Sequence, residues 1–241
     1  MNCKNMHAAA LEPRREGELS RPDAAVAAAF KQSFSVCYLV LFGTAAITFI
    51  EAMRTNNIHA RHILNLETAV SLTAGFVYGW FMAMADKPDF DLKEVVYLRY
   101  VDWCITTPML LLVLLLFFKF HSKAPLSVSM YLLVIGLNYT MLAFGYMGEK
   151  GTINKRLAQT LGFAAFAALL AVIYYFFLHG GRSGYPPFIL FTIFAVVWAL
   201  YGVAAELDDY EKNMMYNVLD IVAKVMLGLG LWLYYGGVAV L

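Results

Sequence analysis

The sequence has few charged residues for its length, and this scarcity excludes most classes of protein. Only 15% of its 241 residues are charged, 18 basic against 17 acidic, whereas 61% are hydrophobic. Soluble domains carry about 25% charged residues. A net charge of +1 also provides no basic surface for a nucleic acid. The composition therefore predicts an integral membrane protein that has the lipid bilayer, and no nucleic acid, as its partner.

Residues suited to metal sites, disulfides and phosphate binding are equally scarce. The three cysteines, at 3, 37 and 104, show no paired spacing, and the five histidines fall in tails, connections or helix ends. Metal sites and disulfide frameworks need such residues at clustered spacings. The sequence also has no glycine-rich phosphate loop. We therefore expect neither a metal site nor a disulfide framework.

Long apolar segments fill the chain instead. A transmembrane helix needs about 20 predominantly apolar residues, and connections rich in Gly, Pro and charge separate such segments. Seven segments fit, at about 33–53, 63–84, 95–118, 126–147, 157–178, 187–205 and 214–236. The predicted fold class is an all-α membrane protein, a bundle of seven transmembrane helices over residues 33–236.

The tails and the connections predict the orientation of the bundle. Residues 1–32 form a polar N-terminal tail without the early apolar run of a cleavable signal peptide, and 237–241 form a short C-terminal tail. The first, third and fifth connections contain bases and no acids: Arg54, Arg61, Lys119, Lys123 and Arg182. Because Lys and Arg are nearly balanced between the connections of the two sides, five against six, the absence of acids from these three connections favours placing them in the cytoplasm. We expect the N-terminus outside and the C-terminus in the cytoplasm.

Ionisable side chains at membrane depth are rare, and four of them are spaced to interact. Asp220 and Lys224 are four residues apart on one helix face, and Arg99, Asp102 and Thr106 share a stripe of the third helix. An isolated charge at this depth costs about 3 kcal/mol, so such groups pair inside the bundle. If the third and seventh helices face each other, the two carboxylates flank Lys224 and the four charges sum to zero. The full set within the segments is Glu51, Glu67, Arg99, Asp102, Asp220 and Lys224.

The lysine allows two interpretations. It can belong to a structural ion-pair network between helices, or it can be a desolvated nucleophile that forms a Schiff base with a carbonyl ligand. Tyr100 and Trp103 flank Asp102, while Trp198 and Tyr201 lie one turn apart on the sixth helix. Aromatic residues in a bundle are more often packing than a ligand pocket. Their coincidence with a buried lysine and two acids favours an elongated apolar slot.

Three motifs resemble those of the microbial (type 1) rhodopsins, most closely the proteorhodopsin group. Residues 99–108 read RYVDWCITTP, like the counterion helix of that family. Residues 144–149 read FGYMGE, and residues 216–224 read YNVLDIVAK, like the helix that carries the retinal lysine. The resemblance extends over about residues 33–236.

This resemblance implies roles for the charged residues. Lys224 would bind all-trans retinal as a protonated Schiff base. Asp102 would be the primary counterion and proton acceptor, Asp220 the second counterion, and Arg99 would order the outer charge network. Thr106 would hydrogen-bond Asp102. The implied pocket consists of Tyr100, Trp103, Leu110, Met141, Gly145, Trp198 and Tyr201, and an apolar Leu110 predicts green rather than blue absorption.

Three positions depart from the family pattern. Val113 stands where outward pumps of this group carry a carboxylate proton donor, so reprotonation should be slow or use Glu67, Glu51 or water. A helix-end charge is the slightly favoured interpretation of Glu67. Gly202 stands where a proline of the sixth helix is expected. Trp80 stands in place of the histidine that proteorhodopsins put beside the counterion, which should extend activity toward acid pH.

The sequence thus predicts a light-driven retinal protein rather than an enzyme, with outward proton transport as the leading function. The alternatives are a light-gated cation channel, which would move other cations besides protons, a slow-cycling sensory photoreceptor, and a transporter without a chromophore. The acids at 206, 208, 209 and 211 would be a solvated loop or, less favoured, a proton-release group. The resemblance also implies a ring-like homo-oligomer.

Overall fold

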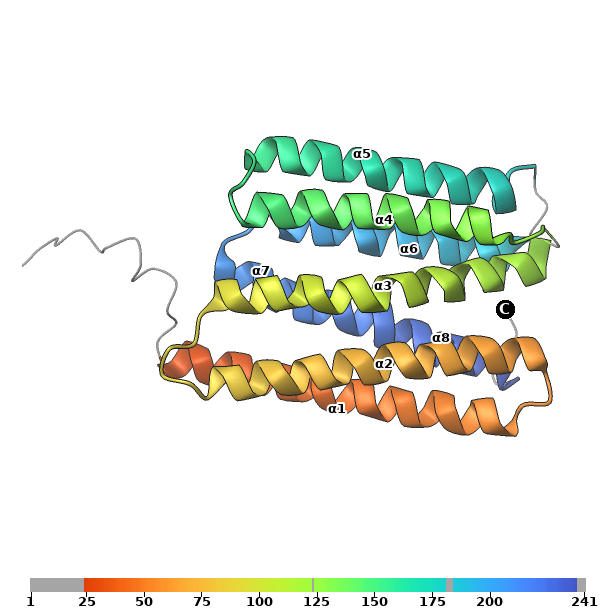
Figure 1. Cartoon of the computed structure of the whole chain (residues 1–241). Helices are drawn as coiled ribbons and strands as arrows, with labels where there is room; N and C mark the ends of the chain where they lie inside the picture. Colours follow the sequence, from red (N-terminus) through yellow and green to blue (C-terminus); the bar gives the residue numbers. More distant parts are fainter. Residues whose placement is uncertain (1–23, 123, 181–183, 238–241) are drawn as a thin grey trace, which may run out of the picture.

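Seven helices long enough to cross a membrane make up the computed structural model, which describes residues 24–122, 124–180 and 184–237 (Figure 1). The last membrane-length helix is divided into α7, the π-helical turn η2 and α8, and the fifth ends in a π-helical turn, η1. The elements are α1 (Ala24–Arg54), α2 (Ile58–Ala85), α3 (Leu92–Ser122), α4 (Val128–Glu149), α5 (Lys155–Ile173), η1 (Tyr174–Leu178), α6 (Tyr185–Ala204), α7 (Asp209–Asp220), η2 (Ile221–Met226) and α8 (Leu227–Tyr235).

Polar side chains in the connections fix where several helices begin. A side-chain oxygen just before a helix satisfies backbone N–H groups that have no partner within the helix. Asn57 accepts from the N–H of His59 at 3.0 Å, and Asp208 accepts from that of Glu211 at 2.9 Å. Ser127 and Asn154 cap α4 and α5 in the same way. The connections predicted from composition therefore also contain the capping residues at which the following helices begin.

All seven predicted membrane segments are present, and three of them begin five or more residues earlier than predicted, among them α2, which begins at Ile58 rather than 63. The first helix begins at Ala24, so residues 24–32, which were expected in the tail, are helical. The last begins at Asp209 rather than 214 because Asp208 caps it. Residues 1–23 and 238–241 of the predicted tails lie outside the described residues, as do Lys123 and Arg182.

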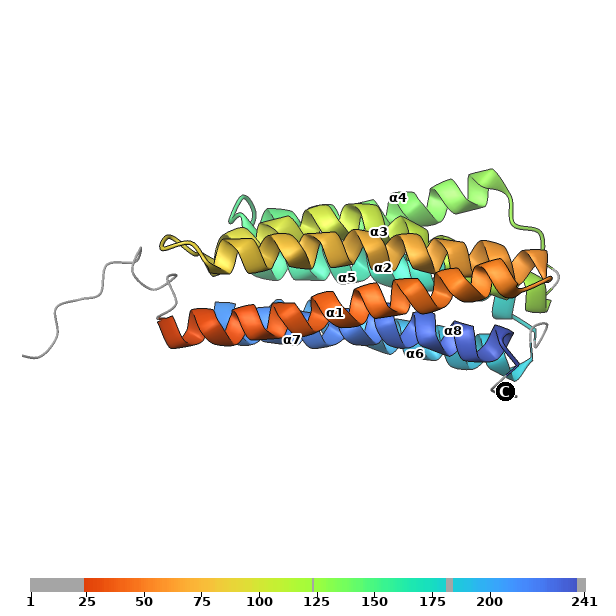
Figure 2. The same cartoon turned by 90° about the horizontal axis from the view of Figure 1, so that it is seen from below.

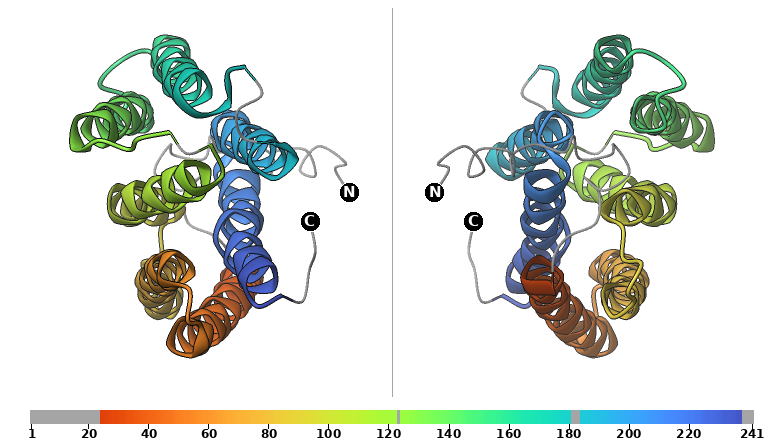
Figure 3. Two further views of the ribbon diagram at one scale, coloured as in Figure 1. Left: turned by 90° about the vertical axis from the view of Figure 1, so that its right-hand side faces the viewer. Right: turned by 90° about the vertical axis from the view of Figure 1, so that its left-hand side faces the viewer.

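The helices follow one another around the bundle in chain order when it is viewed end-on (Figure 3). The last membrane helix closes the ring, because its three parts contact α1, α2, α3 and α6. Figure 2 shows α1 lying against α7 and α8 along their length. Side chains on the last helix can therefore reach groups from most of the bundle.

The outward faces of the helices are apolar, as a bilayer requires. Large apolar side chains such as Phe76 (68% exposed) and Leu39 (67% exposed) point away from the bundle. An exposed apolar surface of this extent marks contact with lipid or with another protein. We call the end where α1 begins the N-terminal end, since the α2–α3, α4–α5 and α6–α7 connections lie there, and the other the C-terminal end (Figure 1).

Candidate functional site

Lys224 lies between the two predicted carboxylates in the centre of the bundle. Its Nζ is 2.6 Å from Oδ2 of Asp102 on α3 and 3.3 Å from Oδ1 of Asp220, one turn earlier on its own helix. All three side chains are at most 3% exposed. The third and last helices face each other as expected. The lysine lies on the π-helical turn η2, whose wider winding is common at functional positions.

Arg99 completes the charge set on the side of the N-terminal end. Its Nη1 is 3.6 Å from Oδ2 of Asp220 and donates to the hydroxyl of Tyr78 at 3.1 Å. Its other nitrogens donate to the side chains of Asn213 and Asn217. Two cations and two anions with mutual contacts are neutral as a group, which reduces the cost of burying them.

The two carboxylates have unequal surroundings. Asp220 accepts hydrogen bonds from Tyr78 at 2.8 Å and from Tyr201 at 2.7 Å, in addition to its contacts with Arg99 and Lys224. Asp102 has Lys224 on Oδ2, and its Oδ1 has no hydrogen-bond partner among the described residues. One carboxylate is fully engaged, whereas the other keeps a free oxygen.

Sequence reasoning missed the neutral members of this network. Tyr78, Asn213 and Asn217 are each at most 1% exposed and connect Arg99 and Asp220 to α2 and α7. A usable signal was present, because Asn213, Asn217, Asp220 and Lys224 recur at spacings of four, three and four on one helix face. A search restricted to ionisable side chains does not find it.

Two residues expected to influence Asp102 differ from the prediction: one bonds to its main chain, and the other lies away from it. The hydroxyl of Thr106 donates to the main-chain carbonyl of Asp102 at 2.9 Å, rather than to its carboxylate. Trp80 is 56% exposed on the outer face of α2, so its assignment beside the counterion was wrong. Helix periodicity explains the second error, because Tyr78 and not Trp80 is on the inward face of α2. The expectation of activity at acid pH rested on Asp102 having no histidine partner; no histidine is among its contacts in the described residues, and the expectation stays a prediction.

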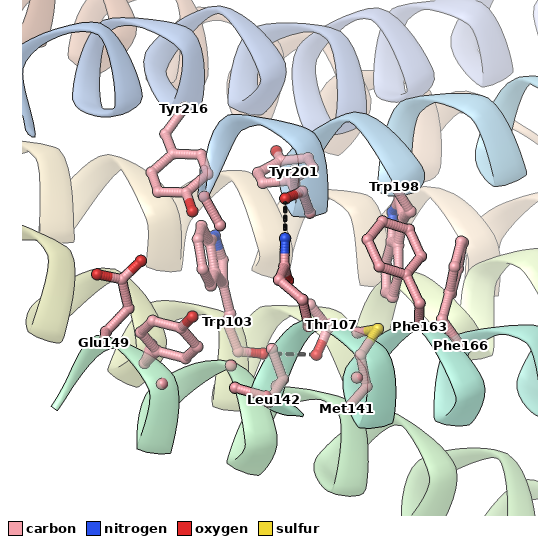
Figure 4. A pocket seen from close by; sticks show the side chains of 18 of the residues that line it. Trp103, Thr107, Met141, Leu142, Glu149, Phe163, Phe166, Trp198, Tyr201 and Tyr216 are labelled. Carbon is pink, nitrogen blue, oxygen red and sulfur yellow. Dashed lines mark hydrogen bonds between the residues drawn. The ribbon is translucent and has the colours of Figure 1, made fainter. Parts of the chain in front are cut away.

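A pocket adjoins Lys224 and crosses the bundle toward α4 and α5 (Figure 4). Its volume is about 120 Å³, several times what one buried water needs. All seven residues predicted to line a retinal pocket contribute to it, together with Lys224 and Asp220. In Figure 4 Phe163, Phe166 and Trp198 gather at one end, and Glu149 and Tyr216 at the other.

Aromatic rings form the walls of this pocket beside Asp102. Trp103 is edge-to-face with Tyr201 (centroids 5.4 Å apart) and with Tyr216 (5.1 Å). Farther along, Phe166 lies nearly parallel to Trp198 at 6.5 Å. The indole Nε1 of Trp103 is buried without a partner among the described residues. These flat, rigid surfaces suit a long conjugated ligand better than a compact one.

Glu67 is the most unusual carboxylate of the bundle. Its side chain on α2 is 0% exposed, and neither oxygen has a hydrogen-bond partner in the described part of the chain. Gly228 on α8 leaves room for it, since a Cβ there would lie 3.3 Å from Oε2. The slightly favoured interpretation of Glu67 as a helix-end charge was wrong, because the group is fully enclosed. Glu51, by contrast, lies 3.8 Å from Arg54 at the end of α1.

The acids between α6 and α7 have structural partners. Asp208 caps α7, and Glu206 lies 3.7 Å from Lys155. Asp209 and Glu149 both pair with the buried Lys212, at 3.3 and 3.0 Å. These contacts account for three of the four acids without a proton-release role.

A membrane bundle with a lysine held between two carboxylates beside an aromatic-lined pocket defines the class of seven-helix retinal proteins. The chain belongs to the bacteriorhodopsin-like protein family, whose sequence model matches residues 29–237. The predicted membership of the microbial rhodopsins is thereby confirmed.

Several known proteins are similar over most of the bundle. The crystal structure of viral rhodopsin OLPVRII is 38% identical, with a TM-score of 0.83, and the match covers 88% of this chain and 99% of that one. The green-light absorbing proteorhodopsin of Gamma-proteobacterium EBAC31A08 is 26% identical over 83% of this chain and 84% of its own length. Opsin-1 of Neurospora crassa is 30% identical over 58% of this chain, which spans about half (50%) of that relative.

Membership of this family implies retinal, bound to a lysine through a Schiff base. The described residues fit such a group. The fully buried lysine of the pocket is Lys224, the walls are apolar and aromatic, and the free Oδ1 of Asp102 and Nε1 of Trp103 leave polar atoms for a bound ligand or water. Lys155 also borders the pocket, but it is the first residue of α5 and its side chain is 47% exposed.

Proposed function

We propose that this protein is a light-driven outward proton pump, with retinal on Lys224 and Asp102 as the proton acceptor. The observation that carries the proposal is the 2.6 Å contact between Lys224 Nζ and Asp102 Oδ2, next to an Oδ1 without a partner. Retinal, when bound, supplies light absorption, a change of shape and a transferable proton at the lysine nitrogen. The protein's own residues determine where that proton goes.

Asp102 is better placed than Asp220 to receive a proton. Protonating Asp220 would weaken its contacts with Tyr78, Tyr201 and Arg99, all of which favour the ionised form. Asp102 would give up only its contact with the nitrogen of Lys224, and that nitrogen is neutral once the proton has left. Asp220 and Arg99 then keep the N-terminal side of the site ordered.

Resupply of the proton requires another group, since Val113 is buried and cannot donate. We assign this role to Glu67. It is enclosed on α2, and Thr68 and Thr48 beside it share a hydrogen bond of 2.8 Å. The hydroxyl of Ser71, one turn away on α2, has no partner in the part of the chain that the structure describes. Hydroxyls of this kind can relay a proton through intervening water. The separation from Lys224 by a relay, rather than a direct contact, predicts slow reprotonation.

The experiment that tests the proposal is light-induced current under voltage clamp in cells supplied with all-trans retinal. A pump gives a small outward current that keeps its sign at every voltage, because light rather than the ion gradient drives it. The matched control is Lys224→Ala, which removes the attachment point and should give neither colour nor current. Coloured protein without any current would contradict the pump and favour a sensory photoreceptor.

The second candidate is a light-gated cation channel, and the polar seam between α1, α2 and α8 favours it. Buried polar groups gather at one interface of the bundle, from Glu67, Ser71, Thr44 and Thr48. An ion that crosses the membrane needs such groups along its path. A channel current would reverse near the equilibrium potential of the permeant ion. The same voltage scan therefore separates the two functions.

A further inference from the structure

Phe163 on α5 occupies the space that a side chain at position 202 of α6 would need. A Cβ built on Gly202 would lie 2.5 Å from Cζ and 2.8 Å from Cε2 of Phe163. Real Cβ atoms do not approach an aromatic ring so closely, so the ring can sit there only because residue 202 has no side chain. Gly202 is thus a notch in α6, filled by a ring from the neighbouring helix.

A hydrogen bond one turn away holds the same two helices together. The amide of Gln159 donates to the main-chain carbonyl of Gly202 at 2.5 Å. In a continuing helix this carbonyl would accept from the N–H of Glu206. Because α6 ends at Ala204, that N–H bonds to the carbonyl of Val203, and the carbonyl of Gly202 is left for Gln159. Gln159 and Phe163 are four residues apart and share one face of α5, so both contacts fall on one residue of α6.

These residues lie at the end of the pocket away from Lys224. Gln159, Phe163 and Gly202 all line the pocket, next to Phe166 and Trp198. Lys224 is on η2, which packs mainly against α1, α2 and α6, whereas α5 packs mainly against α4 and α6, so α6 lies between α5 and the lysine (Figure 3). Phe163 is also 38% exposed, so one part of its ring borders the pocket while another reaches the outer surface between α5 and α6.

We propose that Phe163, seated at Gly202 and held in register by Gln159, closes the ring end of the retinal pocket and determines which retinal ring sizes the protein accepts. The proposal rests on the proposed attachment of retinal to Lys224, because that attachment places the ring at the far end. A bulkier ring needs the space of the Phe163 side chain, and a side chain at 202 would drive Phe163 into the pocket.

The test measures pigment formation in the dark, after the full-length apoprotein is mixed with all-trans retinal or with an analogue that has a naphthyl group in place of the ring. Wild type should form pigment quickly with retinal and slowly with the analogue. Phe163→Ala should speed pigment formation with the analogue by about tenfold relative to retinal. Gly202→Ala should slow pigment formation with retinal by about tenfold and shift its absorption maximum.

The double variant Gly202→Ala/Phe163→Ala provides the decisive comparison. If the two side chains compete for one space, the second substitution removes most of the defect of the first. Gln159→Leu, which keeps the volume and removes the donor, should give a smaller loss of discrimination between the two ligands. Gly136→Ala and Phe188→Ala are matched controls, because Gly136 has open space around it and Phe188 is 53% exposed on α6.

Thermal unfolding of each apoprotein identifies variants that fail to fold. If Gly202→Ala does not fold, Phe163→Ala decides the question alone, since removing a half-exposed ring leaves the backbone of α6 unchanged. The proposal is overturned if Phe163→Ala discriminates between the ligands as wild type does, or if a folded Gly202→Ala behaves like Gly136→Ala. If wild type forms no pigment, the assignment of Lys224 as the retinal attachment site is contradicted instead. If it forms pigment but gives no light-induced current, only the proposed pump function is contradicted.

Discussion

Asp102 and Asp220 both contact Lys224, but their other contacts differ, and this difference suits them to different roles in the proposed function. Asp220 is held by side chains from α2, α3 and α6, whereas Asp102 has one oxygen free of partners among the described residues. Hydrogen bonds to a carboxylate stabilise its charged form. The difference in chemistry therefore comes from the neighbours and not from the residue type.

The first prediction concerns Asp102. Asp102→Asn should form pigment but lose light-driven proton release by at least about a hundredfold, because an amide cannot take the proton from the lysine nitrogen. A pH-sensitive dye after a light flash measures the release. Thr106→Val is the control, since its hydroxyl bonds to the main chain and not to the carboxylate. Undiminished release from Asp102→Asn would remove this residue as acceptor.

The second prediction concerns Glu67. Glu67→Gln should leave proton release intact and slow the return to the dark state by about a hundredfold, because the donor is lost. A small, permeant weak acid should restore the rate by substituting for the carboxyl. Ser71→Ala, which changes an unpartnered hydroxyl one turn away, should slow recovery much less. Recovery of Glu67→Gln at the wild-type rate would leave the donor role without support.

At the scale of the helices, the length of the apolar runs predicted well that seven membrane helices exist, but it predicted less well where each helix begins and ends. All seven spans were predictable because lipid demands about 20 apolar residues in each. The start of α1 at Ala24 was not, because residues 24–32 combine polar groups with an alanine-rich stretch that is helical by propensity rather than by hydropathy. The π-helical turn at Lys224 has no signature in hydrophobic spacing, so no pattern could place it.

The site was predictable where charge made it visible. Lys224, Asp220, Asp102 and Arg99 stood out as ionisable groups in apolar segments, and the structure brings them together. Tyr78 was not recognisable, since a tyrosine on a membrane helix has many other uses. Its position depends on how α2 is rotated, which is a property of packing between helices.

The third prediction concerns the attachment of α7 to the rest of the bundle. Asn217 accepts from Arg99 and donates to Ser33 of α1 at 2.8 Å, so it joins three helices. Asn217→Leu should destabilise the protein by about 1–3 kcal/mol, because it leaves buried donors unsatisfied. Thermal unfolding of the pigment measures this loss. The adjacent Val218→Ala, at a position 56% exposed, should change stability little; an equal effect of both would refute the argument.

For the complete bundle, the distribution of charged connections predicts the orientation in the membrane, and with it the direction of the proposed proton transport. The connections at the C-terminal end contain the basic residues predicted to lie in the cytoplasm, Arg54 and Arg61 among them. Glu67 approaches Gly228, one turn beyond Lys224 toward the C-terminal end. Asp102, by contrast, lies one turn from Arg99, on the side of the N-terminal end. Outward pumping requires the N-terminal end to face outside.

The fourth prediction tests this orientation. In a Cys3→Ser background, a membrane-impermeant thiol reagent should label Lys87→Cys, in the α2–α3 connection, on intact cells. It should label Asn56→Cys, in the α1–α2 connection, only after permeabilisation. Cys37 is buried and Cys104 lies within a membrane helix, so neither should react. The opposite labelling pattern would place the N-terminus inside and reverse the direction of the proposed pump.

The contacts of Asp220 also have a mechanical consequence. This one carboxylate receives Tyr78 of α2, Arg99 of α3 and Tyr201 of α6, while its own helix carries Lys224. Loss of the charge on the lysine alters the pull on Asp220, and every one of these contacts must readjust at the same time. In the proposed cycle, a change in the charge of Lys224 would therefore alter the forces among four helices at once. Absorbed light would be converted into movement at the same carboxylate that holds these helices together in the resting protein.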